Sequence, residues 1–271
     1  MIPHPVLRNA LSVAALSVCA ALSACAAPGP VPPSDARPAV LPSASGPPSA
    51  RVDCRTVRCV ALTFDAGPGP YTARLLDVLK EKDVRATFFL LGSRHVTDRP
   101  ELVRREAAEG HELGNHTWSH PRLTELPDPE VERQLVRVQE RVRELTGRTP
   151  TLMRPPQGRT GKRVAEVCRR LGLAQVLWSV TAKDYKERDP EVITRRVLAG
   201  ARRDGIILLH DIYPGTVPAV PAIVDGLRAR GLEPVTVSEL FAPGVPEPGR
   251  VYRTAPPRVE PGSSASPVAE E

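Results

Sequence analysis

Short apolar runs alternate with amphipathic stretches over most of the chain, from about residue 59 to residue 241. The apolar runs predict strands at residues 60–64, 86–90, 112–113, 152–153, 175–178 and 206–209. Apolar residues at helical spacing predict a helix capped by Thr72 and further helices over residues 98–110, 128–146, 161–171, 189–203 and 217–230. This alternation predicts an α/β fold with a parallel sheet covered by helices, and the number of units favours a closed or nearly closed (β/α) barrel. An open, doubly wound sheet is the alternative.

Polar side chains of chemically active types follow the predicted strands. They are Asp65, His116, His120, Arg154, Asp184 and His210. The carboxyl ends of parallel barrel strands converge on one face, and active sites are built at that face. The sequence therefore predicts that residues far apart along the chain meet in one site.

The two ends of the chain have compositions that do not build a packed core. Residues 1–24 combine a short basic start with an apolar run too short to span a bilayer, which is typical of an export signal. The run ends in Leu-Ser-Ala-Cys, which resembles the bacterial lipobox and makes Cys25 the predicted lipid anchor. An ordinary secretory signal with a chance cysteine is the alternative. Residues 25–53 predict a tether rich in proline, alanine and serine, and residues 243–271 predict a disordered tail.

One folded domain, over residues 54–242, remains between these ends. The export signal and lipid anchor predict that this domain lies outside the cytoplasm, held at the cell membrane and facing the cell wall. The formal net charge is +6, and the basic residues are scattered among acidic ones. A nucleic-acid-binding surface usually shows a clustered basic stripe with aromatic side chains beside it. We therefore expect no nucleic-acid partner.

Export places the cysteines in an oxidising compartment. Cys54 and Cys59 stand close together just before the first predicted strand, and we expect them to form a disulfide. Cys168 lies on the apolar face of a predicted helix, which favours a small buried core residue over a nucleophile. A four-cysteine zinc site is excluded, since the sequence has no second close pair of cysteines.

His116 and His120 are spaced four residues apart, and on one helical turn this spacing aims two imidazoles at a common point. Zinc accepts imidazole nitrogen, and catalytic zinc sites keep an open position for water. Taken alone, the pair is equally compatible with a surface position.

Four further motifs accompany the histidine pair. They are TFDAGP at residues 63–68, RPPQG at residues 154–158, DY at residues 184–185 and LLHD at residues 208–211. Together with the histidine pair, and in this order, they resemble the polysaccharide deacetylase domain, carbohydrate esterase family 4. The resemblance implies a distorted (β/α) barrel and a divalent metal, commonly zinc. It also implies hydrolysis of acetyl groups from N-acetylglucosamine polymers or acetylated xylan.

The resemblance also implies a role for each matching residue. The general base is Asp65, its supporting arginine is Arg154, the metal ligands are His116 and His120, the general acid is His210, and the aspartate that tunes it is Asp184. On the substrate side, the implied residues are Tyr185, in place of a tryptophan of the groove wall, Leu208 and Leu209 at the acetyl pocket, and Pro156. The implied partner is a polysaccharide such as peptidoglycan or a chitin-like polymer, and we expect a monomer.

Three positions depart from the family pattern. Ala66 stands where the family usually carries a metal-binding aspartate, Thr181 replaces another aspartate, and Gln157 replaces an aromatic residue. A site with one anionic ligand fewer should bind metal more weakly. Asp65 could move to the metal and give up its role as base, waters could complete a weaker but working site, or the domain could bind glycan without catalysis. We favour the second outcome, because the other motif residues would have little reason to stand together in a bare binding module.

Overall fold

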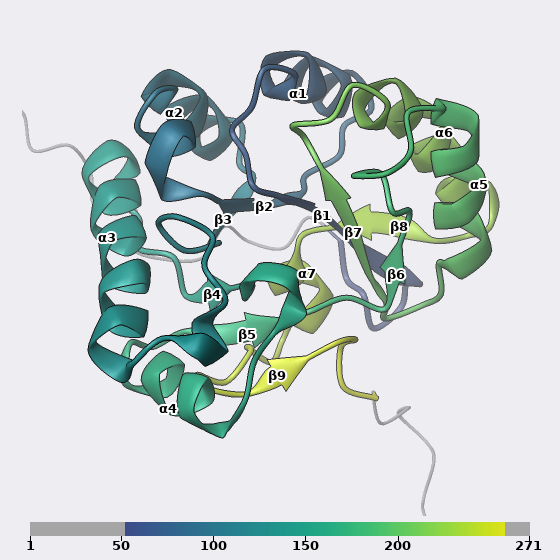
Figure 1. The fold of residues 1–271 in the computed structure, drawn as a ribbon. Helices are drawn as coiled ribbons and strands as arrows, with labels where there is room; N and C mark the ends of the chain where they lie inside the picture. The colour runs from purple at the N-terminus through teal and green to yellow at the C-terminus, as the bar shows by residue number, and fades with distance from the viewer. Residues whose placement is uncertain (1–51, 258–271) are drawn as a thin grey trace, which may run out of the picture. The chain divides into compact units, whose positions relative to one another are not determined.

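The computed structural model describes residues 52–257, and the observations below concern that part of the chain (Figure 1). The predicted signal, the predicted anchor Cys25 and almost all of the predicted tether lie outside the described residues, as do residues 258–271. No helix within residues 52–257 is long and apolar enough to cross a membrane.

The described residues form one sheet in which all named strand pairs are parallel. The strands are β1 (Cys59–Asp65), β2 (Thr87–Leu90), β3 (Glu112–Asn115), β4 (Leu152–Met153), β5 (Ala174–Val176), β6 (Val180–Thr181), β7 (Ile206–His210), β8 (Glu233–Val235) and β9 (Val251–Tyr252). Their order is β6-β7-β1-β2-β3-β4-β5-β9, and β8 pairs with β1. All seven residues of β1 are buried, as expected for a central strand of a parallel sheet.

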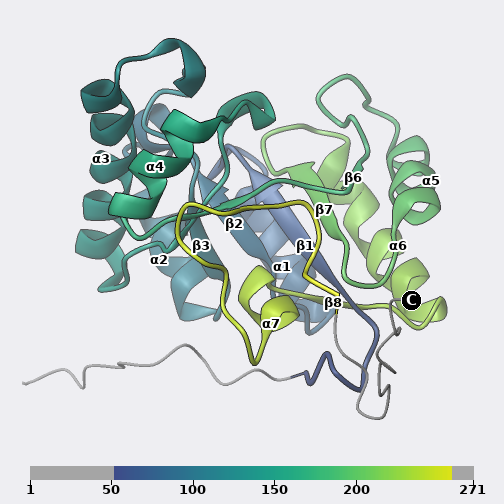
Figure 2. The same ribbon diagram turned by 90° about the horizontal axis from the view of Figure 1, so that it is seen from below.

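The longer helices cover the outer side of the curled sheet, whereas the short helix Val237–Phe241 lies inside the ring of strands (Figures 1 and 2). The helices are α1 (Thr72–Glu81), α2 (Pro100–Ala108), α3 (Asp128–Thr146), α4 (Lys162–Arg170), α5 (Pro190–Gly200), α6 (Thr216–Ala229) and the short α7 (Val237–Phe241), and they are joined in places by the turns η1 (Gly92–Val96), η2 (Leu123–Glu125) and η3 (Pro156–Gly158). Thr72 is the first residue of α1 rather than its predicted cap. The predicted α/β fold with a distorted, incompletely closed (β/α) barrel is confirmed.

The predicted disordered tail is wrong for residues 243–257. Val251 and Tyr252 form β9, which pairs with Gln175 and Val176 of β5, and Tyr252 is buried against Phe241. Beyond β9 the backbone N–H of Ala255 donates to the carbonyl oxygen of Asp204, in the loop before β7. These tertiary contacts order a segment that has no periodic pattern of its own, so the folded domain extends past residue 242.

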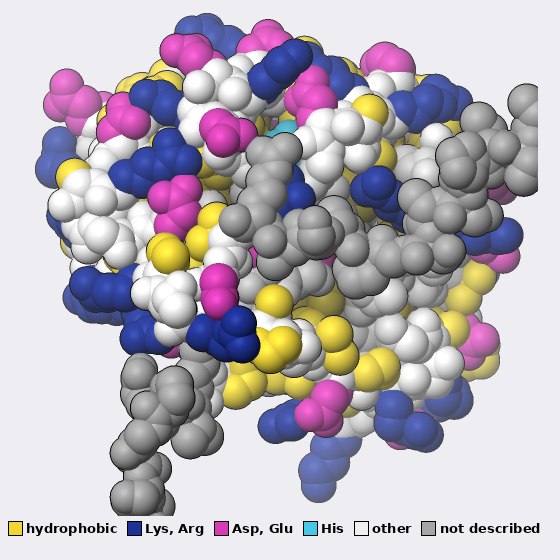
Figure 3. All heavy atoms as spheres, turned by 180° about the vertical axis from the view of Figure 1, so that it is seen from behind, with side chains coloured by type: hydrophobic (Ala, Val, Ile, Leu, Met, Phe, Trp, Pro, Cys, Tyr) yellow, Lys and Arg dark blue, Asp and Glu magenta, His cyan; other side chains and the backbone are white. Residues whose placement is uncertain are grey.

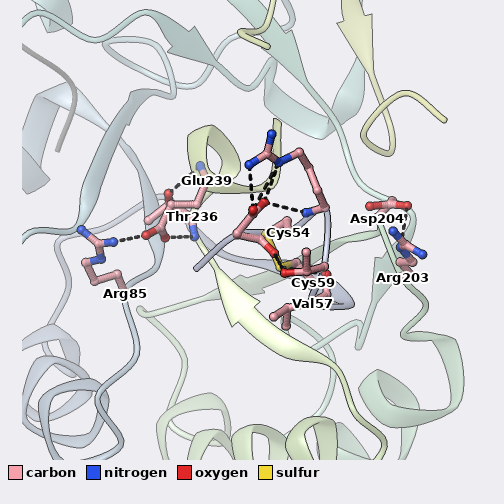
Figure 4. Close-up of a disulfide and its surroundings, with 11 residues drawn as sticks. Cys54, Val57, Cys59, Arg85, Arg203, Asp204, Thr236 and Glu239 are labelled. Carbon is pink, nitrogen blue, oxygen red and sulfur yellow. Dashed lines mark hydrogen bonds and ion pairs between the residues drawn. A yellow bond between two sulfur atoms is a disulfide. The ribbon is translucent and has the colours of Figure 1, made fainter. Parts of the chain in front are cut away.

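The predicted disulfide is present. Cys54 and Cys59 are bonded to each other and both are buried at the amino end of β1 (Figure 4). Cys168 is free and buried in α4, and burial raises the pKa of its thiol to about 12. This thiol has the character of a core residue rather than a nucleophile.

Charged side chains of both signs are interspersed over the described residues of the face shown in Figure 3. Among the described residues, several exposed charged side chains form ion pairs within one helix, for example Arg133 with Glu130 and Arg169 with Glu166. Exposed pairs of this kind contribute little to stability. They show how a scattered basic composition is balanced locally on the surface.

Candidate active site

The fold brings the predicted site residues to one end of the sheet. Asp65 ends β1 and His210 ends β7, and the two residues are direct partners in the register of these neighbouring strands. His116 follows β3, Arg154 follows β4 and Asp184 follows β6. The prediction that polar residues meet at the carboxyl ends of the strands is confirmed for this set.

Arg154 holds Asp65 in place. Its guanidinium Nη1 donates to Asp65 Oδ1 at 2.6 Å and to Thr63 Oγ1 at 2.8 Å. Its remaining nitrogens donate to the carbonyl oxygens of Val176 (2.8 Å) and Leu177 (3.1 Å). Arg154 is fully buried and Asp65 is nearly so. A buried ion pair whose hydrogen bonds are all made has one geometry, so Asp65 is fixed and its Oδ2 is left free of Arg154.

His116 and His120 lie in the loop after β3, so the expected helical turn is wrong. Thr117 and His120 have positive φ angles of 69° and 61°, which lie outside the right-handed helical region. The rings nevertheless converge as predicted, with centroids 4.9 Å apart and edge to face.

The two imidazoles have the orientation and charge of metal ligands. His116 Nδ1 donates to the Arg154 carbonyl oxygen at 2.8 Å, and its Nε2 lies 3.9 Å from Asp65 Oδ2. A carbonyl that fixes Nδ1–H in this way leaves Nε2 as the ligand atom. Burial lowers the pKa of His116 to about 4 and also lowers the pKa of His120, which favours the neutral, metal-binding form.

This donor set fits a divalent cation such as zinc, which accepts imidazole nitrogen and carboxylate oxygen. Within residues 52–257, however, no group of three or more His, Cys, Asp or Glu side chains is arranged to hold a metal ion. The described residues therefore offer a pair of imidazoles with a carboxylate nearby, rather than a closed three-ligand site.

Asp184 and His210 form a second dyad. Asp184 Oδ1 accepts from His210 Nδ1 at 2.9 Å, and Oδ2 accepts from the backbone N–H of His210 at 2.7 Å and from Thr216 Oγ1 at 2.8 Å. Burial acts to lower the pKa of His210, but the hydrogen bond and charge of Asp184 outweigh it, and the net pKa is raised. His210 is thus favoured as an imidazolium with Nε2–H available.

The residues predicted to contact substrate occupy different environments. Tyr185 is 46% exposed, and its ring lies 6.2 Å from that of His210. Leu208, Leu209 and Pro156 are buried. The sequence reading missed Tyr213, whose ring lies 5.4 Å from that of His210 on the loop after β7. A lone tyrosine in a loop carries no pattern that would have singled it out.

A cavity of about 370 Å³ lies at the opposite end of the sheet, near the disulfide. Its walls include Arg85, His111, Thr151 and Ser238, which flank the amino ends of strands or follow β8. None of the predicted site residues lines this cavity. The predicted site residues therefore lie at the carboxyl ends of the strands, apart from this cavity.

Known proteins and a family model resemble this chain. The polysaccharide deacetylase family model matches residues 53–176. Peptidoglycan-N-acetylglucosamine deacetylase PgdA of Listeria monocytogenes is 44% identical over 188 residues, which cover 69% of this chain and 40% of the relative. The chain thus spans less than half the length of that relative. A chitooligosaccharide deacetylase of a Bradyrhizobium species is 38% identical over 197 residues, covering 67% of this chain and 90% of the relative.

Solved structures share the fold. A structure of T48 deacetylase with substrate has a TM-score of 0.71 and 40% identity, covering 74% of this chain and 99% of the other. A pseudoenzyme of carbohydrate esterase family 4, solved as a mutant, has a TM-score of 0.65 and 28% identity, covering 69% and 68% of the two chains. The fold and these similarities establish that this chain belongs to the polysaccharide deacetylase family.

Proposed function

We propose that this chain is a metal-dependent hydrolase that removes acetyl groups from cell-wall or chitin-like polysaccharide, acting on N-acetylglucosamine units. One observation carries the proposal. Asp65, which is paired with Arg154, and His210, which is paired with Asp184, end two neighbouring strands. The His116–His120 pair lies at the same end of the sheet. A base, an acid and a candidate metal site in one place are what amide hydrolysis requires.

Asp65 is the proposed general base. Arg154 occupies Oδ1, so Oδ2, on the side of His116, is the oxygen that takes a proton from the attacking water. His210 is the proposed general acid. Asp184 holds Nδ1–H and raises the pKa of the imidazole, so Nε2–H can protonate the leaving amine.

His116 and His120 are the residues that would hold the divalent cation. When bound, a cation such as zinc supplies Lewis acidity toward the acetyl carbonyl and lowers the pKa of water. We further propose that Ala66 stands in place of a metal-binding aspartate, which leaves a site of weaker affinity that still works. The absence of a three-ligand cluster among residues 52–257 supports this reading.

The same observation favours a second candidate, a catalytically impaired glycan-binding protein. With two imidazoles and no assembled third ligand within the described residues, the domain would bind saccharide without turnover. The similarity to a family pseudoenzyme supports keeping this alternative.

One experiment separates the two functions. The purified chain is incubated with acetylated chito-oligosaccharide or peptidoglycan, with and without added zinc or cobalt, and released acetate is measured. Metal-stimulated release that His116→Ala abolishes is expected for the hydrolase. Saccharide binding that is unchanged by a chelator and by His116→Ala, without acetate release at any metal concentration, would establish the binding protein instead.

We also propose that a lipid on Cys25 anchors the chain at the cell membrane, where the domain faces the cell wall. The lipobox-like sequence around this residue supports the anchor. Expression in a bacterial host with labelled fatty acid should label the wild-type chain and not Cys25→Ser, which should be released from the membrane fraction. Equal membrane retention of both chains would contradict the anchor.

A further inference from the structure

Exposed basic side chains stand on the loops that follow β2, β3, β4 and β6, at the end of the sheet that carries the candidate site. They include Arg94 after β2, Arg122 after β3, Arg159 after β4, and Lys183 and Lys186 after β6. None of them has a part in the proposed chemistry. Within residues 52–257, Arg94, Arg159, Lys183 and Lys186 form no ion pair.

Arg122 connects the loop of the histidine pair with the loop that follows Arg154. It stands two residues after His120, and its Nε donates to Oε1 of Gln157, three residues after Arg154, at 3.3 Å. Its Nη1 donates to Glu125 at 3.2 Å, and both side chains of this ion pair are exposed. Exposed pairs of this kind contribute little, so a substrate anion can take the place of Glu125. Nη2 makes no hydrogen bond to the described residues, so one edge of the guanidinium remains for a ligand.

Lys186 and Lys183 bring positive charge to the other dyad. Lys186 Nζ lies 5.7 Å from the centroid of the Tyr185 ring, and that ring lies 6.2 Å from the ring of His210. Lys183 directly precedes Asp184, which accepts from His210 Nδ1. A cation–π contact leaves the three N–H donors of an ammonium group free to bind an anion.

The acidic side chains of the same loops offset these charges only in part. Glu187 is paired with Arg196 of α5 at 3.3 Å, and Asp189 caps the start of α5. Asp98 is exposed, and Arg99 follows it directly. The exposed edge of the site therefore has an excess of positive charge.

In the sheet, the basic residues stand on both sides of the proposed acid and base. The strand order runs β6-β7-β1-β2-β3, and His210 ends β7 while Asp65 ends β1. Lys186 follows β6, on one side of this pair, and Arg122 follows β3, on the other side. A glycan that spans the site would therefore meet a cation on each side of its reacting acetamide.

The chemistry of these side chains selects for an anionic ligand. Arginine and lysine carry hydrogen-bond donors and no acceptors, and they bind carboxylates through charge-assisted hydrogen bonds. A chitin-like polymer offers only neutral groups to them. In a strand such as that of peptidoglycan, where sugars that carry a carboxylate alternate with N-acetylglucosamine, each N-acetylglucosamine has a potential anion on both sides.

We propose that Arg122 and Lys186 are specificity-determining residues that bind carboxylates on the sugars next to the reacting unit. The site then takes a carboxylate-bearing glycan in preference to a neutral one. This inference rests on the proposed function, because it names the substrate class of the same site.

A matched pair of substrates tests the preference in the full chain. One is an alternating oligosaccharide of N-acetylglucosamine and N-acetylmuramic acid with free lactyl carboxylates, and the other is the same oligosaccharide with those carboxylates converted to primary amides. Acetate release is measured with added zinc or cobalt. The wild type should have a KM about tenfold lower for the carboxylate form, with similar kcat, as expected for two exposed ion pairs. Raising the salt from about 0.1 M to about 1 M shortens the screening length from about 10 Å to about 3 Å and should remove most of this difference.

Three variants assign the preference to the two residues. Arg122→Gln and Lys186→Gln should each raise KM about three- to fivefold for the carboxylate form only, because each loses one exposed ion pair. Arg104→Gln, which removes a charge from the exposed side of α2, is the control and should leave both KM values unchanged. Equal KM values of the wild type for the two substrates, or a rise in both KM values in Arg122→Gln and Lys186→Gln, would overturn the proposal.

Binding of the same two oligosaccharides, measured by calorimetry, separates this inference from the proposed function. If no chain releases acetate, but the wild type binds the carboxylate form more tightly and the double variant Arg122→Gln/Lys186→Gln does not, the specificity stands and the proposed function fails. If the wild type binds both forms equally and releases acetate from both, the proposed function stands and the specificity fails.

Discussion

Asp184 and His210 contact each other twice, through the imidazole Nδ1 and through the backbone N–H of His210. Asp184→Asn would keep an acceptor near the ring but remove the charge that raises the pKa of His210. Without that charge, burial lowers the pKa of His210, and a smaller fraction of the imidazole is protonated at neutral pH.

The expected result is a loss of about 10²–10⁴-fold in kcat at neutral pH, the range attributed to general acid–base catalysis. The basic limb of the pH–rate profile should move to lower pH, and an NMR titration of His210 should move in the same direction. Tyr213→Phe, which keeps the ring beside His210, serves as the control and should leave both limbs in place. A profile of Asp184→Asn that is lower but unshifted would show that Asp184 is structural only.

Ala66→Asp should strengthen metal binding. Ala66 has a φ of 65°, and its backbone N–H donates to the carbonyl oxygen of Phe89 at 3.0 Å. Aspartate is among the residues enriched in this left-handed region, so the substitution adds a carboxylate without new backbone strain. We expect at least a tenfold gain in cobalt or zinc affinity by calorimetry and a parallel gain in acetate release.

The double variant Ala66→Asp/His116→Ala is the control for this gain. It should lose most of the added affinity, because the carboxylate then lacks its imidazole partner. If Ala66→Asp lowers both affinity and turnover, the pocket is adapted to alanine and position 66 is not a vacated ligand position.

Arg154→Lys should lower the free energy of unfolding, although both side chains are basic. The guanidinium serves Asp65, Thr63 and two backbone carbonyls from a rigid fork, whereas an ammonium group has only three donors on one atom. Breaking a buried ion pair costs about 3–5 kcal/mol, and we expect Arg154→Gln to lose an amount of that order, with Arg154→Lys losing less. Urea unfolding measures both, and Arg133→Lys, at an exposed pair, should change little. Equal stability of Arg154→Gln and the wild type would contradict the role of Arg154 as the support of Asp65.

The alternating pattern was sufficient to predict the barrel and the edge on which its chemistry lies. Helix α3 was predicted with the bounds that it has in the structure, because a long amphipathic stretch carries a strong local signal. The short β9 could not be predicted, because Val251 and Tyr252 stand in a proline-rich segment and are ordered by pairing with β5. Pairing between distant strands cannot be read from the spacing of apolar and polar residues within either strand.

The candidate site also has features that the sequence predicted and features that it did not. The side-chain types and their order along the chain pointed to the dyads, but the loop that carries His116 and His120 depends on two positive φ angles that spacing alone does not reveal. The burial of Glu106 was missed for a different reason. It stands among charged residues of α2 and has the composition of a solvated helix face, yet it is fully buried.

The Cys54–Cys59 disulfide should stabilise the fold without touching the chemistry. It closes a loop with a sequence separation of 5 at the amino end of β1, whereas Asp65 ends the same strand at its other end. A short loop places the expected stabilisation at the lower end of the usual range, about 2 kcal/mol. The double variant Cys54→Ser/Cys59→Ser should therefore unfold at lower urea concentration with kcat and KM unchanged.

A reductant should lower the stability of the wild type to the level of the double variant and should leave the double variant unaffected. Equal stability of the double variant and the oxidised wild type would mean that the bridge contributes nothing, and a loss of activity in the double variant would mean that the two ends of β1 are coupled.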